Sequence, residues 1–258
     1  MAMHEIPMEQ SELHLLGHDV QEIRRSFQQH PEFAQPLADV RDPDRHARYM
    51  VVADLSWQIF EHATAMHLLL TEQLYTSALV VLRAIYEAQV TLRYLVQHQK
   101  SQDEAVIFLA FSYLRDIKHF GHQADLVDEY SAIVERMPKH LVEEAKRRAA
   151  KHPPTWSGKT VSRMADEAGM VGHVPTYGFL SAEAHSAALG RHVSSARTGD
   201  MMSIETGRQM SPEEVESTAN FARRAVHFAF KTIWGIFDAP KISFDSTDPE
   251  EWRRKTPM

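Results

Sequence analysis

The stretch LVVLRAIYEAQVTLRYLVQH, residues 79–98, decides the fold class of this chain. Apolar residues lie on almost every side of a helix drawn through it, which is typical of a helix inside a core. Elsewhere apolar and polar residues never alternate for long, and Asn-Gly or Asp-Gly hairpin turns are absent. The sequence therefore predicts an all-α protein, a bundle of about four long helices with a smaller helical insertion.

Capping residues and prolines set the expected helix boundaries. Ser101 with Glu104, and Ser211 with Glu214, have the spacing of capping boxes, and Pro138 splits one amphipathic region. We expect helices at about 9–29, 42–73, 77–99, 102–121, 124–150 (split), 160–168, 176–189 and 211–237. We expect residues 1–238 to form a single domain, with its core in 42–73, 77–99, 102–121 and 211–237, its insertion in 124–190, and a loosely ordered tail at 239–258.

Composition limits the classes of function. The 258 residues are 43% hydrophobic, which suffices for a sizeable core, and the formal charge of −7 argues against a general polyanion-coating protein. Local basic patches, such as residues 146–152, remain open to phosphates. The chain has no cysteine, so disulfides, thiol catalysis and cysteine zinc sites are excluded. With no signal-peptide pattern and no long apolar run, we expect a soluble cytoplasmic protein without membrane contact.

The opening stretch carries a polar stripe. At 100° per residue its members fall within about 60° of one another, and they are Arg83, Glu87, Tyr94 and His98. Arg93 lies on a different side. Arg83 and Glu87, at i and i+4, are predicted to form a local ion pair on an exposed face, or else to lie in an interhelical cleft where further partners offset the cost of burial.

A second stripe occurs in YGFLSAEAH, where Tyr177, Ser181 and His185 share one helical face. Hydroxyl and imidazole groups suit a polar ligand or acid/base catalysis, and His185 is the candidate acid or base. The alternative is a buried hydrogen-bond cluster that joins the insertion to the bundle. We expect this stripe to face Arg83 and Glu87 and to build an interhelical polar pocket.

Together these motifs resemble an uncharacterised bacterial all-helical family, a domain of unknown function. The resemblance rests on the Arg-x3-Glu helix, the Trp-bearing loop PPTWSGK and the Tyr-x3-Ser-x3-His segment, and it covers about residues 45–235. It implies a helical fold and no established activity.

The spacing of Arg93 and His98 is similar to the Arg-x4-6-His signature of HEPN-type ribonucleases. That resemblance implies a homodimeric, all-α effector of stress or defence that cuts RNA without a metal or other cofactor, with Arg93 and His98 as catalytic residues. A chain with 16 histidines also produces this spacing by chance.

A metal site is a further alternative. Asp116 and His119 have the carboxylate-x-x-His spacing that helical bundles use for metals, and His122 follows three residues later. A di-iron site needs a second such motif, and we find only one. The leading interpretation is thus an effector that acts on RNA. The alternative is a non-catalytic ligand-binding or scaffolding bundle, whose ligand could be a small molecule. The second alternative is a metal-binding bundle.

Overall fold

The computed structural model describes residues 11–29, 43–98, 101–151, 155–170, 193–198, 201–206 and 210–237. Helices dominate these residues, so the predicted all-α class is confirmed. None of the helices described is both long and apolar enough to cross a membrane. The helices are α1 (Glu12–Gln29), α2 (Pro43–Thr71), α3 (Tyr75–Gln97), α4 (Ser101–His119), α5 (Ala124–Glu135), α6 (Lys139–Ala149), α7 (Val161–Glu167) and α9 (Pro212–Phe237).

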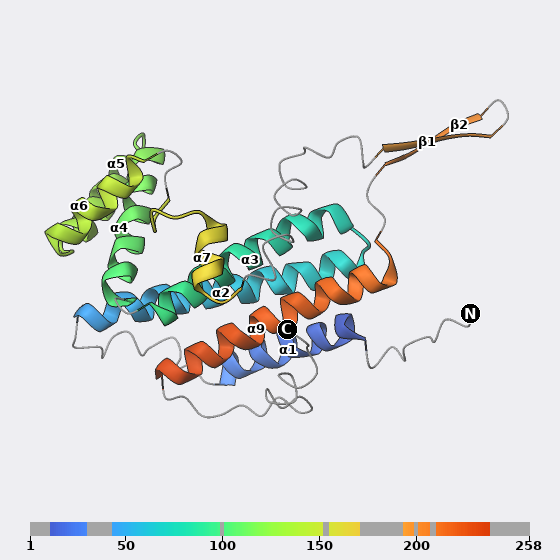
Figure 1. Ribbon diagram of the computed structural model, residues 1–258, viewed down its shortest axis with the longest axis horizontal. Coiled ribbons are helices and arrows are strands. Elements are labelled where there is room, and N and C mark those ends of the chain that lie inside the picture. The colour runs from blue at the N-terminus through green and yellow to red at the C-terminus, as the bar shows by residue number, and fades with distance from the viewer. Residues whose placement is uncertain are drawn as a thin grey trace.

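Four long helices, α1, α2, α3 and α9, lie side by side and form the body of the molecule (Figure 1). The α2 helix packs against α1, α3 and α9, and it runs in the opposite direction to those three (Figure 1). Ring contacts fix the register of α3 on α9, because Tyr86 stacks on Phe221 and, seven residues later in both helices, Arg93 covers Phe228. The two helices are therefore parallel and in step along their contact.

The fourth helix of the bundle differs from the one expected. We expected residues 102–121 in the core set, and Ala105, Val106, Ile107 and Ala110 of α4 do belong to the buried core, but α4 packs on α5, α6 and one end of α2 and not beside α9 (Figure 1). The α1 helix takes the place beside α9 instead, because Leu16, Val20 and Ile23 form a buried apolar face. Gly17 lies where α1 meets α2, since a Cβ there would collide with the His67 ring of α2.

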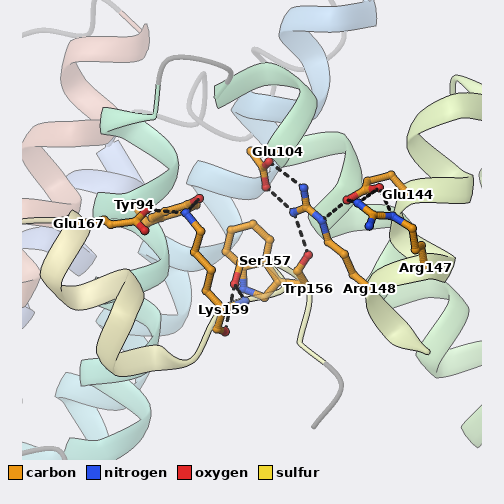
Figure 2. A network of polar contacts seen from close by, with 9 residues as sticks. All are labelled: Tyr94, Glu104, Glu144, Arg147, Arg148, Trp156, Ser157, Lys159 and Glu167. Carbon is orange, nitrogen blue, oxygen red and sulfur yellow. Dashed lines mark hydrogen bonds and ion pairs between the residues drawn. The ribbon is translucent and has the colours of Figure 1, made fainter. Parts of the chain in front are cut away.

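The α4–α6 group is fixed by a cluster of polar contacts that Figure 2 shows, and we call it the Arg148 cluster. Arg148 donates two bonds to Glu104, at 2.6 and 3.0 Å, one to Glu144 at 2.7 Å, and one to the carbonyl of Trp156 at 3.2 Å. Glu104 was expected to cap its own helix through Ser101, but its carboxylate faces Arg148 instead. A buried cation binds a carboxylate more strongly than a backbone amide does, and this overrides the local signal.

The second predicted capping box is confirmed at the start of α9. The Ser211 backbone N–H donates to Glu214 at 2.9 Å, and the Glu214 N–H donates to the Ser211 hydroxyl at 3.2 Å. These reciprocal bonds satisfy two backbone donors that the first turn of a helix leaves free. They fix where α9 begins.

One antiparallel strand pair corrects the expectation that the chain has no strand. β1 (Val193–Thr198) pairs with β2 (Met201–Thr206), with Val193 opposite Thr206. The pair lies apart from the helical body (Figure 1). Two residues, Gly199 and Asp200, separate the strands, and Gly-Asp is a combination that favours two-residue hairpins. The absence of Asn-Gly and Asp-Gly dipeptides therefore did not exclude a hairpin.

Candidate functional site

A cavity of about 710 Å³ lies between α3 and α9, beside the first turn of α1 and the residues that follow α7. We call it the α3–α9 groove. Its walls combine apolar side chains with charges of both signs. The lining residues are Glu12, Leu79, Leu82, Gln89, Arg93, Gly169, Met170, Met210, Glu213, Glu214, Glu216, Ser217, Thr218, Asn220, Phe221 and Arg224.

Two side chains of α3 that line this groove, Gln89 and Arg93, each have a buried polar atom without a hydrogen-bond partner among the described residues. Gln89 is only 3% exposed, and its Oε1 atom accepts no hydrogen bond. The Nε atom of Arg93 is also buried and donates none. The two residues are four apart, so they lie next to each other on one face of the helix. Buried polar atoms without partners cost about 1–3 kcal/mol each, which makes an unfilled acceptor and donor in one cavity a mark of a ligand site.

The charge of Arg93 is likewise uncompensated by the residues that the structure describes. Its guanidinium lies 4.0 Å from the centre of the Phe228 ring, and no described carboxylate forms an ion pair with it. Burial, and then repulsion from Arg224, lower the pKa of Arg93. Both effects penalise the cation, and both would be relieved by an anion placed between the two arginines.

Carboxylates gather at the opposite end of the groove. Glu213 and Glu214 are exposed on the first turn of α9, and Glu216 lies half-buried on the second. By the register of α3 on α9, Arg224 is level with Gln89, one turn before Arg93, and it marks the far end together with Arg93, whose charge it repels. Eight residues of helix separate Glu216 from Arg224, which is about 12 Å. The groove is thus acidic at one end and basic at the other.

A buried polar cluster joins α1 to α9 beneath the groove. Asp19 accepts bonds from Arg223 Nε at 2.7 Å and from His227 Nε2 at 2.6 Å, and Arg223 also reaches Glu12 at 3.2 Å. Burial alone would raise the pKa of Asp19, but His227 and Arg223 outweigh it and lower that pKa. Sequence patterns alone assigned no role to Arg223 and His227. The structure shows that they hold one carboxylate and fix the position of α9.

The predicted Arg83–Glu87 ion pair is confirmed, with 2.8 Å between Arg83 Nε and Glu87 Oε1. The side chains are 20% and 39% exposed, and neither lines the α3–α9 groove. Their expected partners, Tyr177, Ser181 and His185, lie outside the described residues. The predicted pocket between the two stripes therefore stays a prediction.

The HEPN-like residues have different surroundings. Arg93 lies over Phe228 of α9, whereas the ring of His98, at the end of α3, packs 5.1 Å from the ring of Tyr94. A spacing of five residues turns a helix through about 140°, so the two side chains leave α3 on different sides. Within one chain the structure does not bring Arg93 and His98 together. Their role in catalysis stays a prediction.

The expected metal ligands do not gather into a metal site. Within the described part of the chain, no group of three or more His, Cys, Asp or Glu side chains is placed to hold a metal ion. Asp116 lies 3.6 Å from Arg115, the His119 ring packs on Phe120, and His122 contacts Gln123. The wide angle between Asp116 and His122 on a regular helix explains why the trio diverges.

Neither Gln89 nor Arg224 was predicted to be a site residue, although the sequence contains one signal for Gln89. A glutamine four residues before Arg93, inside an otherwise apolar helix, marks a second polar face. Arg224 could not be distinguished from other exposed arginines, because only the packing of α9 on α3 brings it to Arg93.

Comparison with known proteins adds a family and no activity. No curated protein matches the chain, no solved structure matches it, and no similarity to HEPN-type ribonucleases is found. A family model does match residues 49–201, more than half of the chain, which include Gln89 and Arg93 but neither α1 nor α9. The chain therefore belongs to a family of unknown function, DUF5677.

Proposed function

We propose that this protein binds an anionic ligand in the α3–α9 groove. The observation that carries the proposal is the state of Arg93, a half-buried cation whose buried Nε–H has no acceptor among the described residues and whose neighbour is a second cation, Arg224. A phosphate or carboxylate placed there would accept the free N–H and neutralise the repulsion. Of the hypotheses that the sequence raised, a ligand-binding helical bundle gains most from this geometry.

The walls of the groove suit a small organic molecule. Pockets for such ligands are mostly apolar, with a few polar groups that fix orientation, and their volumes run from about 300 to 1,000 Å³. Here Leu79, Leu82 and Phe221 supply apolar surface, while Gln89 and Arg93 supply one acceptor and one donor. The anion would bind at the basic end, and the remainder of the ligand would extend along the helices.

The test is titration calorimetry of the full chain with inorganic phosphate, in wild type and in Arg93→Met. Methionine keeps the apolar stem and removes the charge, and losing a charged hydrogen bond costs about 1.5–3 kcal/mol, so we expect at least tenfold weaker binding. The control is Arg115→Met, because Arg115 is 69% exposed and does not line the groove. Equal phosphate affinity in all three proteins would contradict the proposal.

RNA remains one anionic ligand to test, as the HEPN resemblance predicts. Two adjacent arginines suit a phosphodiester, but cleavage would also require His98, which lies on another side of α3. If the resemblance is correct, wild type cuts RNA in the presence of a chelator and His98→Ala does not. The homodimer and the cytoplasmic location that the sequence predicts also remain proposals.

A further inference from the structure

We propose that the ligand of the α3–α9 groove is an extended zwitterion, a short peptide of three or four residues with both ends free. This rests on the proposed function and adds what the opposite end of the groove recognises. The peptide carboxylate would bind Arg93 and Arg224, and its terminal ammonium would meet Glu213 and Glu216. The two charged ends of the groove would thus be matched by one molecule.

The charge pattern favours a zwitterion over a simple anion. Four glutamates line a cavity that holds two arginines, and they are Glu12, Glu213, Glu214 and Glu216. A polyphosphate would be repelled by that end, since like charges in a shared cleft disfavour binding. A cation alone would be repelled by the arginines. A molecule with one charge of each sign at its two ends satisfies both.

The spacing selects the length of the peptide. From Arg224 back to Glu216 is eight residues of helix and to Glu213 is eleven, or about 12 and 16 Å. Three extended residues span about 10 Å. A hydrogen bond of about 3 Å at each end brings the total to about 16 Å, which matches the separation of Glu213 from Arg224 along the axis of α9.

Gln89 provides an observation independent of these charges. It is 3% exposed, it lies one helical turn before Arg93, and its Oε1 lacks a donor. An extended peptide carries a backbone N–H at every residue, so a donor falls near this atom when the carboxylate is bound. The apolar walls formed by Leu79, Leu82 and Phe221 would contact the peptide side chains.

The experiment is calorimetric titration of the full chain with three probes: trialanine, N-acetyl-trialanine and trialanine amide. Each modified probe lacks one terminal charge. We expect trialanine to bind at least about fivefold more tightly than either of them, the effect of one partly screened ion pair. The Arg93→Met substitution should weaken the binding of trialanine and of N-acetyl-trialanine equally, because both probes keep the carboxylate.

The Glu213→Gln variant tests whether Glu213 binds the terminal ammonium of the peptide. Glu213 is exposed on the helix surface, so its substitution leaves the fold intact, and Glu143→Gln, at an exposed position on α6, is the control. We expect Glu213→Gln to weaken trialanine severalfold and to leave N-acetyl-trialanine unchanged, which isolates the coupling between the two charges. Glu143→Gln should change neither.

The outcomes separate the two proposals. Arg93-dependent phosphate binding together with equal affinity for trialanine and N-acetyl-trialanine would overturn the peptide and leave the anion site standing. Binding of neither phosphate nor trialanine would overturn both. Tight trialanine binding that Glu213→Gln does not affect would contradict the assigned orientation.

Discussion

Two half-buried arginines of this protein have opposite surroundings. Arg148 in the α4–α6 group donates to Glu104, Glu144 and the Trp156 carbonyl (Figure 2). Arg93 in the α3–α9 groove faces an aromatic ring and another arginine. Burial would lower the pKa of Arg148, but its two carboxylates raise it, whereas burial and Arg224 lower the pKa of Arg93.

The difference separates an arginine that holds the fold from one that is ready for a ligand. A buried charge is stabilising only if its partners are already present. Arg148 has them, so its role is complete within the chain. The Lys159 amine resembles Arg148 in this respect, because it donates hydrogen bonds to the Tyr94 hydroxyl and to Glu167 within the chain (Figure 2).

The largest effect should follow from breaking the Arg148 cluster. Glu104→Gln removes the carboxylate that takes two bonds from Arg148, and the side chains are only 13% and 10% exposed. Arg148 keeps its bond to Glu144, but losing one carboxylate of a largely buried ion pair costs about 3 kcal/mol, which we expect as the loss in the free energy of unfolding in urea. Glu143→Gln, whose pair with Lys146 is exposed, should lose less than about 0.5 kcal/mol. Equal losses in the two variants would refute a structural role for the cluster.

The next effect concerns Asp19, the carboxylate that ties α1 to α9. Asp19→Asn removes the charge that Arg223 and His227 share, at a cost of about 2 kcal/mol in unfolding free energy. Gln21→Asn, at an exposed position on α1, is the control. A loss in the control as large as that in Asp19→Asn would show that the buried bonds contribute little.

The same residue gives a pH dependence. The folded-state pKa of Asp19 is lowered, so its stabilisation is fully present above the unfolded pKa of about 3.9 and is lost as pH falls below it. We expect wild type to lose its advantage over Asp19→Asn when unfolding is measured from pH 6 down to pH 3. An advantage that is constant over that range would contradict the lowered pKa.

The smallest effect on stability should come from Arg93. Without ligand, Arg93→Met removes a cation that has no described carboxylate partner, so we expect unfolding free energy to stay the same or rise by up to about 1 kcal/mol. Thermal unfolding of the two proteins in a buffer free of phosphate and carboxylates checks this. A loss of 3 kcal/mol would place Arg93 among the structural arginines and remove the contrast with Arg148.

Most helices could be predicted from the sequence, since local signals determine them. Pro43 begins α2, Pro138 separates α5 from α6, and the Ser211 capping box precedes α9. Local signals gave wrong predictions where a residue distant in sequence binds the same side chain. Glu104 has the spacing of a cap and binds a residue 44 positions away instead.

The site was less predictable for the same reason. Arg93 was identified through a resemblance to a nuclease signature, and its importance here comes from its lack of an ion-pair partner among the described residues, which only a packed structure shows. Arg224 lies near Arg93 because α9 packs parallel to α3, and no residue spacing within either helix predicts that packing. Arg83 and Glu87 were predicted correctly because an i, i+4 pair is a local feature.

One measurement tests the contrast directly, by following both arginines in a single sample. In nitrogen-15 spectra of the arginine side chains, we predict that the Arg93 Nε–H resonance moves progressively as phosphate is added, because this N–H gains an acceptor. The Arg148 Nε–H, already bonded to Glu144, should stay in place. If the Arg93 resonance does not move, or if both move together, Arg93 is not the anion-binding residue that the groove implies.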